Sequence, residues 1–589
     1  MARVWDRLDP RSYVRLQEAL LRDVVSRFIY PFSPFYRRLF DEHGIKPRHV
    51  RSLRDLQRIP LTSARDFESV PEDDWRPFRA LLRPDERALR RSGNRGLLRQ
   101  VARERLLRGD DAAERLIAEE FKPVHLHLPD ANGPVAGYTM RDLSALAQAA
   151  SRAMAVAGAR RSDVVVSTLP YGPSLPFWNT YYGAIGAGAS SLHLGGGDIV
   201  RPGQAALWME RLAATVLVSQ PGYAEGLLRL APPATLSTLR LLLLWAPVEM
   251  QGARERYLLR LRTGGATDAT VATLLGIPEA RVAWAECPIA PDRPETSYGY
   301  HTYPDLELLE VVDQEGTEVA EGEPGELVYT SLDWRGSALL RYRTGLVARG
   351  GITWDRCPGC RRTVPRLVGD LSRVEWRIRV VGPRGEVTVD LADVIPILWR
   401  ATGVALWQLD VAKGAGPRGT DAVTAWLAGA LQQDAVALQK RLVSYGVRCR
   451  LVPFPEFARR LGVGRERPEV RVRVREAPAR PRPAEVGIRK EAVVPPPSIV
   501  PDRPPPERPA EREAAAGDAT IEEAGPEADE PEVTVVAGPG PVKVEPPPPA
   551  DEEKERGSAS RAEGERPEQG AVRIDGPESA RAPRSPRGT

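Results

Sequence analysis

Short apolar runs alternate with helical stretches between residues 124 and 373, and this alternation limits the possible folds more than any other feature. A short, uninterrupted apolar run fits a strand that is buried on both faces, because helices cover both sides of a parallel sheet. The pattern therefore predicts a layered α/β body. The expected strands are residues 164–169, 191–194, 215–219 and 239–245, and a close-packed helix is expected over residues 181–189.

Two further segments flank this body, which is assigned residues 121–373. Apolar residues spaced by four, at Leu16, Leu20, Val24 and Phe28, predict a helical lead-in over residues 1–120. Residues 374–475 read as strand, strand, helix and strand, which predicts a small α+β domain. Its expected strands are residues 405–411, 422–427 and 448–453, and its expected helix is residues 432–445.

The end of the chain has a different composition. The sequence contains 56 proline and 51 glycine residues among 589, and most of the excess lies after about residue 477. A segment with so few apolar residues cannot bury enough surface to offset the entropy lost on ordering. We therefore predict a disordered tail over residues 476–589, which serves as an interaction arm for a protein partner.

Charge and hydropathy argue against two kinds of partner. The 83 basic and 79 acidic residues give a net charge of +4, and both signs are mixed along the chain. A nucleic-acid partner requires a concentrated basic face, and none is visible in the sequence. No apolar run approaches the roughly 18 residues of a membrane span, and the first residues lack a signal-peptide core, so a cytoplasmic protein is expected. The four cysteines are then metal ligands or buried apolar residues rather than disulfides.

Residues 340–346 read Leu-Arg-Tyr-Arg-Thr-Gly-Leu, and a Cys-Pro-Gly-Cys segment follows at residues 357–360. These segments resemble a signature of the phenylacetate-CoA ligase family of adenylate-forming enzymes, and the likeness extends over about residues 30–375. The resemblance implies the fold of that family, a large body followed by a small mobile domain. It also implies the family's chemistry, in which ATP and Mg²⁺ convert a carboxylic acid to an acyl-adenylate and CoA then forms the thioester.

The resemblance carries over to a few nucleotide-binding positions. Thr139 closes an Ala-Gly-Tyr-Thr segment that follows the family's phosphate loop, and Glu249 lies in the counterpart of its adenine loop. Glu279 stands where a family glutamate holds Mg²⁺. The implied remnant of the nucleotide site is Thr139, Glu249, Arg343, Thr344 and Gly345, with Glu279 as a remnant magnesium ligand.

Several family features are missing from the same site. Leu346 replaces the aspartate that holds the ribose, and its side chain accepts no hydrogen bond. Residues 128–135 contain one glycine and no serine, threonine or lysine, so they lack the features of a phosphate loop. Trp245 replaces an adenine-loop glycine, Asp370 replaces a hinge arginine, and residues 465–467 offer no catalytic lysine. Because ATP activation needs phosphate, ribose and metal contacts together, the sequence predicts a decayed ATP site with no assigned catalytic residue.

The cysteines indicate a metal site. Cys357 and Cys360 have the spacing of a zinc knuckle, and Cys287 with His301 would complete a set of the soft ligands that Zn²⁺ prefers. Their sequence contexts are similar to those of zinc-bearing family members. Four protein ligands leave no open position, so the expected role is structural. The alternative is that the Cys-x-x-Cys spacing is accidental and Cys287 is a small core residue.

The remaining histidines are ambiguous. His125 and His127 alternate on an expected strand and face the same side, which permits metal binding but supplies no carboxylate beside it. His193 precedes a glycine-rich turn, residues 195–197, which the resemblance assigns to the wall of the acyl pocket. A satisfied core histidine is the other interpretation of His193.

Two functions remain open from the sequence. The first is a scaffold or small-ligand binding module with the family fold and a decayed ATP site. The second is an active ATP-dependent acyl-CoA ligase that activates an aromatic or other carboxylic acid. The missing phosphate loop, Leu346 and the absent lysine favour the first.

Overall fold

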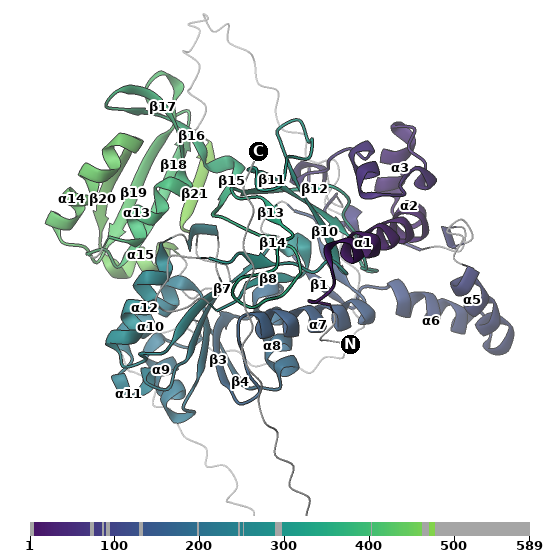
Figure 1. The fold of residues 1–589 in the computed structure, drawn as a ribbon, viewed down its shortest axis with the longest axis horizontal. Helices are drawn as coiled ribbons and strands as arrows, with labels where there is room; N and C mark the ends of the chain where they lie inside the picture. Colours follow the sequence, from purple (N-terminus) through teal and green to yellow (C-terminus); the bar gives the residue numbers. More distant parts are fainter. Residues whose placement is uncertain are drawn as a thin grey trace, which may run out of the picture. The chain divides into compact units, whose positions relative to one another are not determined.

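The structure is a computed structural model, and it describes residues 5–70, 76–84, 88–89, 95–128, 133–196, 199–245, 248–250, 252–288, 297–401, 403–461 and 470–476 (Figure 1). These residues all belong to one compact unit, Met1–Gly487. The tail expected over residues 476–589 lies outside the described residues, apart from Glu476.

The described residues of the amino-terminal segment are mainly helical. Helix α1 (Pro10–Val24) continues through a π-helical turn (Val25–Ile29) into α2 (Tyr30–Phe32), and α3 (Pro34–Glu42) follows. The side chains of Asp9 and Ser33 accept backbone N–H groups at the starts of α1 and α3, which fixes where these helices begin. Helices α5 (Arg95–Arg108) and α6 (Asp110–Phe121) follow later in this part.

The buried stripe of α1 differs from the stripe expected from the sequence. Its buried residues are Tyr13, Gln17, Leu21 and Val24, whereas Leu16 and Leu20 are only partly buried. The amide of Gln17 donates to the backbone carbonyl of Glu307 at 3.0 Å, so a polar residue occupies the centre of the stripe. A hydrophobicity pattern alone counts such a residue as exposed, which explains the shift.

The body is built on a nine-stranded sheet with the order β13-β14-β9-β8-β7-β6-β5-β3-β4. Strands β4, β3, β5, β6 and β7 are parallel, and the remaining strands add in antiparallel fashion. The four expected strands are all present in this sheet. The bounds are β3 Val164–Pro170, β4 Ser190–Gly195, β5 Val216–Ser219, β6 Leu241–Trp245, β7 Thr270–Gly276, β8 Ala283–Glu286, β9 Tyr300–His301, β13 Ile352–Thr353 and β14 Arg366–Leu367.

Helices pack against this sheet, as Figure 1 shows. Strand β6 is buried along its whole length, which explains why it is uniformly apolar. The expected close-packed helix is part of α8, where a Cβ atom at Gly183 would lie 2.6 Å from Met154 Cγ of α7. The helices of the body are α7 Met140–Val156, α8 Leu175–Ala187, α9 Pro202–Arg211, α10 Pro221–Leu230, α11 Pro233–Leu236 and α12 Ala253–Thr263.

Two smaller sheets complete the body. Strands β1 (His125–His127) and β2 (Ala136–Tyr138) form an antiparallel pair. A four-stranded antiparallel sheet has the order β10-β11-β12-β15 and carries the Arg-Tyr-Arg-Thr-Gly segment on β12. Its strands are β10 Glu307–Val312, β11 Gly325–Ser331, β12 Tyr342–Ala348 and β15 Leu371–Arg373.

The carboxyl-terminal part contains the three strands and the helix that the sequence predicts. Its sheet has the order β20-β19-β18-β21, in which β18 and β19 are antiparallel while β20 and β21 are parallel to their neighbours. The hairpin β16–β17, helices α13 and α15 and strand β21 were not expected. The bounds are β16 Arg377–Gly382, β17 Gly385–Asp390, α13 Ile395–Trp399, β18 Leu406–Lys413, β19 Ala422–Ala428, α14 Gln432–Leu442, β20 Val447–Val452, α15 Phe454–Leu461 and β21 Val472–Glu476.

Helix length and hydropathy also bear on membranes. Among the described residues, no helix is both long enough and apolar enough to cross a bilayer.

One buried carboxyl group stands out in the body. Glu307, at the start of β10, accepts hydrogen bonds at Oε1 from Trp284 Nε1 (2.6 Å) and from the Tyr303 backbone N–H (3.0 Å). Its other oxygen has no hydrogen-bond partner among the described residues. Burial raises the pKa of Glu307 to about 8, so this side chain is protonated at neutral pH.

The protonated Glu307 makes stability depend on pH. Between about pH 4.5 and 8 the folded state keeps a proton that the unfolded state has released, so the free energy of unfolding is expected to fall as pH rises through this range. At about 1.4 kcal/mol per pKa unit the total is a few kcal/mol. Urea unfolding at several pH values should show that Glu307→Gln removes this component, because the amide keeps the acceptor and carries no charge.

The matched control is Glu315→Gln, because Glu315 is an exposed residue in the turn between β10 and β11. This change should leave the pH dependence as it is in the unaltered protein. An unchanged pH dependence in Glu307→Gln would contradict the assignment of a neutral buried carboxyl group.

Candidate functional site

The structure brings together the four residues expected to bind a metal. Cys287 follows β8, His301 ends β9, and Cys357 and Cys360 lie in a turn before β14. Their ligand atoms all lie within 4.8 Å of one another. The Sγ atoms of Cys287 and Cys357 are 3.7 Å apart, and His301 Nε2 is 3.1 Å from Cys360 Sγ.

The local backbone orients these ligands. His301 Nδ1 lies 3.2 Å from the Ala285 carbonyl, and an N–H at Nδ1 leaves Nε2 free to face the cysteines. Gly359 permits the tight turn, because a Cβ atom there would lie 2.6 Å from the Tyr298 ring and 3.2 Å from Cys287 Sγ. The donor set fits zinc, since a tetrahedral site with bonds of about 2.3 Å places two sulfur atoms about 3.7 Å apart.

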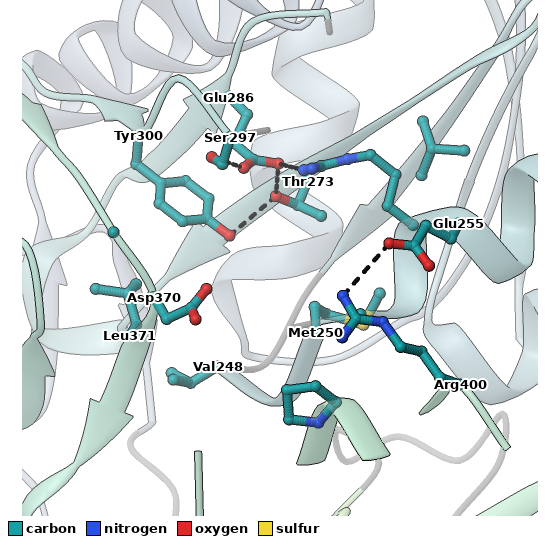
Figure 2. Close-up of a pocket in the computed structure, with 15 residues that line it drawn as sticks. Val248, Met250, Glu255, Thr273, Glu286, Ser297, Tyr300, Asp370, Leu371 and Arg400 are labelled. Atoms are coloured by element: carbon teal, nitrogen blue, oxygen red, sulfur yellow. Dashed lines mark hydrogen bonds and ion pairs between the residues drawn. The ribbon is translucent and has the colours of Figure 1, made fainter. Parts of the chain in front are cut away.

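A cavity of about 240 Å³ is lined by Glu286 and Tyr300, the chain neighbours of Cys287 and His301 in the cysteine cluster. We call it the polar cavity (Figure 2). Its lining includes residues of β7, of the start of α12, of the segment after β6, and of the hinge segment (residues 368–373). The lining residues are Val248, Met250, Gly252, Arg254, Glu255, Val271, Thr273, Glu286, Ser297, Tyr300, Gly369, Asp370, Leu371, Pro396 and Arg400.

A charged network forms one wall of the polar cavity. Glu286, only 3% exposed, accepts hydrogen bonds from Arg254 at 2.6 Å and from the hydroxyls of Thr273 and Ser297. Tyr300 Oη lies 2.9 Å from the Thr273 hydroxyl. Burial acts to raise the pKa of Glu286, but the Arg254 guanidinium and these hydrogen bonds outweigh burial and lower it. The network therefore holds an ionised carboxylate.

The opposite side of the polar cavity is more open. Arg400 pairs with Glu255 at 3.4 Å, and both side chains are exposed. Figure 2 shows the exposed side chain of Asp370 beside Leu371, between Tyr300 and Val248. The volume is below the roughly 300–1,000 Å³ of drug-sized ligand pockets, so the cavity suits a small polar group rather than a whole nucleotide triphosphate.

Sequence reasoning missed this network. Arg254, Thr273 and Ser297 belong to no motif, and their common partner, Glu286, was assigned no role from the sequence. The partners come from different elements, so no spacing along the chain marks them. The weak signal available was a charged residue, Glu286, at the end of an otherwise apolar run.

The three nucleotide positions expected on β12, which are Arg343, Thr344 and Gly345, do not line the polar cavity. Arg343 forms an ion pair with Glu326 at 2.5 Å, and the Thr344 hydroxyl donates to the Leu327 carbonyl at 2.7 Å. The Gly345 backbone N–H donates to Glu326 at 3.2 Å. These groups are therefore engaged with β11.

Leu346 and Glu279 have different surroundings. Leu346 is 0% exposed and belongs to the main hydrophobic core. It lies on β12, where it is paired with Arg373 of β15. Glu279 lies just after β7 and accepts a hydrogen bond from the Tyr342 hydroxyl at 3.2 Å. Glu279 thus stays close to the Arg-Tyr-Arg-Thr-Gly segment.

The other expected nucleotide positions lie at helix starts or outside the described residues. The Thr139 hydroxyl accepts the Asp142 N–H at 3.2 Å and so begins α7, while Asp142 accepts the Thr139 N–H at 3.1 Å. The side chain of Glu249, half of the phosphate-loop counterpart (residues 129–132 of 128–135) and residues 465–467 lie outside the described part of the chain.

Trp245 fills the space over the end of β7. Its side chain is 6% exposed, and a Cβ atom at Gly276 would lie 2.8 Å from Trp245 Cζ2. The same Cβ would lie 3.0 Å from Leu175 of α8. The indole is therefore packed between α8 and the segment that leads to Glu279.

His125 and His193 contact aromatic residues of α8, and His125 packs against His127. Among the described residues, no carboxylate joins these histidines in a group that could hold a metal. His127 Nδ1 lies 2.9 Å from the Tyr138 hydroxyl, and burial lowers the pKa of His127 to about 3. The rings of His125 and His127 are 4.8 Å apart, but among the described residues the cysteine cluster is the only group with metal-site geometry. The ring of His193 packs against Phe177 (5.6 Å) and Tyr181 (5.5 Å).

Comparisons with known proteins agree with this architecture. The family described as AMP-binding enzyme matches residues 137–332. Phenylacetate-coenzyme A ligase of Thermus thermophilus is 28% identical over 379 residues, covering 63% of this chain and 73% of that protein. The Escherichia coli enzyme of the same name is 27% identical over 343 residues, covering 57% of this chain and 66% of that protein.

Solved structures show the same fold. A crystal structure of 2-hydroxyisobutyryl-CoA ligase with 2-HIB-AMP, in the postadenylation state, matches 76% of this chain and 88% of that chain. Its TM-score is 0.56 at 17% sequence identity, and a second structure of the same ligase gives 0.55. Residues 137–332 thus match the AMP-binding enzyme family, and the chain is a distant homologue of phenylacetate-coenzyme A ligases.

Proposed function

We propose that this protein keeps the adenylate-forming fold but does not activate carboxylic acids with ATP, and that it acts as a small-ligand binding module. The observation that carries the proposal is the position of Leu346. The side chain lies wholly inside the hydrophobic core, directly after the Arg-Tyr-Arg-Thr-Gly segment. An apolar buried side chain there offers nothing to a ribose hydroxyl.

The neighbouring groups support the same conclusion. Arg343 and the Gly345 N–H are satisfied by Glu326, so ATP would have to displace an existing ion pair and hydrogen bond. Trp245 fills the space above Gly276, where a smaller residue would leave room for a ligand. A nucleotide would therefore lack hydrogen-bond partners at Arg343 and Gly345, and it would lack the space that Trp245 fills.

One observation favours the second candidate, an active acyl-CoA ligase. Glu279 keeps its place after β7 and its contact with Tyr342, so a carboxylate is still present where the resemblance places a magnesium ligand. An active enzyme would need another segment to hold the phosphates. Calorimetric titration with Mg-ATP distinguishes an active ligase from a binding module that does not use ATP.

The ligand that the body suits best is a small aromatic carboxylic acid. Phe177, Tyr181 and His193 form an aromatic wall between α8 and β4. Neither ring nitrogen of His193 has a hydrogen-bond partner among the described residues, and burial lowers the pKa of this histidine. A neutral imidazole N–H can donate to a carboxylate. The relatives named for phenylacetate support this class of ligand.

We further propose that the metal is zinc and that its role is structural. All four ligands come from the protein, so no coordination position is left for a substrate. The cluster joins the ends of β8 and β9 to the turn before β14, three segments that are distant in the sequence. Metal binding would stabilise this edge of the sheet.

The metal proposal predicts about one zinc per chain in freshly purified protein. Cys357→Ser should remove the metal and lower the melting temperature, whereas Cys449→Ser should change neither, because Cys449 lies on β20 and outside the cluster. Elemental analysis and thermal unfolding measure both effects. If protein purified without any chelator contained no zinc, the assignment of a zinc site would be wrong.

The ligand proposal predicts saturable binding of phenylacetate in the absence of ATP. His193→Leu should weaken binding at least tenfold, because it removes a hydrogen bond to a charged group worth about 1.5–3 kcal/mol. The control His43→Leu alters an exposed histidine at the end of α3 and should leave binding unchanged. Titration followed by NMR tests this, and the absence of saturation at millimolar phenylacetate would disprove it.

The ATP proposal predicts a dissociation constant for Mg-ATP above the millimolar range. Two lost charge-assisted hydrogen bonds of about 1.5–3 kcal/mol each weaken binding by roughly a hundredfold to ten-thousandfold. Isothermal titration calorimetry measures the constant directly. Glu279→Gln provides the comparison, because a residual magnesium site would make this variant bind more weakly than the unaltered protein. Micromolar binding of Mg-ATP would establish the ligase candidate instead.

A further inference from the structure

One face of the carboxyl-terminal sheet carries arginines from both of its edge strands. Arg448 and Arg450 lie on β20 and are paired in register with Thr424 and Trp426 of β19. On the other edge, Arg473 of β21 is paired with Asp410 of β18. Residues paired directly across a sheet point to the same side, so these arginines share one face.

The same register extends across the middle strands. Asp410 is paired with Thr424, and Gln408 with Trp426, so these four side chains lie between the two rows of arginines. Arg475 follows Arg473 on the same face, two residues further along β21. We call this surface the arginine face, and it consists of Gln408, Asp410, Thr424, Trp426, Arg448, Arg450, Arg460, Arg473 and Arg475.

Helix α15 covers only one end of the arginine face. Phe457 and Leu461 of α15 pack against Leu406 and Ala428. From the same helix, Arg460 places its guanidinium 4.5 Å from the centroid of the Trp426 ring. The guanidinium of Arg450 lies 5.7 Å from the centroid of the same ring, so two cations lie close to this indole.

The positive charge on the arginine face is only partly neutralised. Asp410 pairs with Arg460 at 3.4 Å and with Arg475 at 3.1 Å. Arg448, Arg450 and Arg473 are exposed, and none of them has a carboxylate at ion-pair distance within the described ranges.

Buried polar atoms on the arginine face also lack partners. Trp426 Nε1 and Asp410 Oδ1 have no hydrogen-bond partner in the described part of the chain. One atom is a donor and the other an acceptor, so a ligand at this place must offer both kinds of group. Nucleic acid bases supply both donors and acceptors, and they stack on aromatic rings and on guanidinium planes.

We propose that the arginine face binds single-stranded nucleic acid. The phosphates contact the arginines of β20 and β21, and a base stacks on the Arg450–Trp426–Arg460 group. The two edge strands are three strand spacings apart, about 14 Å, which leaves room for a strand to cross the sheet between them. The sequence alone indicated no nucleic-acid partner, because the arginines of β20 and β21 come together only when the sheet forms.

The test is fluorescence anisotropy of a labelled 12-nucleotide oligo(dT) titrated with the full chain. The paired substitution Arg448→Glu with Arg450→Glu should weaken binding at least tenfold. It should also reduce the slope of log K against log salt concentration by about 1.4, since each single-strand phosphate contact contributes about 0.7. Trp426→Leu should weaken binding and leave the salt slope unchanged.

The matched control is Arg377→Glu with Arg379→Glu, which reverses two exposed arginines at the same spacing on β16. Control protein should bind within twofold of the unaltered chain, and all variants should show unaltered circular dichroism. Absence of oligo(dT) binding at low salt overturns the proposal, and so does an equal loss in the control. Poly-glutamate binding without oligo(dT) binding also overturns it and assigns the face to an acidic protein.

Discussion

The pairing of β8 with β7 on one side and β9 on the other fixes the chemistry of the body. Ala285 is paired with Leu274 and with His301, so the strand that ends in Glu286 is held at both edges. Glu286 then supplies the acceptor of the polar cavity, and Cys287, which follows the strand, supplies one member of the cysteine cluster. A slip of one residue would exchange the two faces of the strand and lose both sites.

Much of the fold follows from local patterns in the sequence. Strands such as β6 are uniformly apolar because they are buried on both faces, and the pattern of residues 374–475 gave the order of β18, β19, α14 and β20. The grouping of Cys287, His301, Cys357 and Cys360 was also predictable, since Cys357 and Cys360 are three residues apart and cysteine and histidine are rare in this chain. The apolar pattern of a segment shows which of its side chains are buried, and the buried side chains determine which strands and helices form here.

Other features depend on contacts between distant segments and could not be read from the sequence. The Arg254–Glu286 ion pair joins α12 to β8, and no spacing predicts it. The alternation of valine and arginine in β21 is typical of an exposed strand. The pairing of β21 with β18 is a tertiary contact, which this alternation does not predict. Leu346 could be recognised as an apolar substitution, yet only the structure shows that core packing surrounds it.

The central claim is that the adenylate-forming fold persists here without adenylation. The exchange of labelled pyrophosphate into ATP tests it most directly, because this reaction reports acyl-adenylate formation before CoA is needed. The account predicts no exchange above the acid-free background for any aromatic or aliphatic acid. Acid-dependent exchange that Glu279→Gln abolishes would contradict the account and show that the nucleotide site is active.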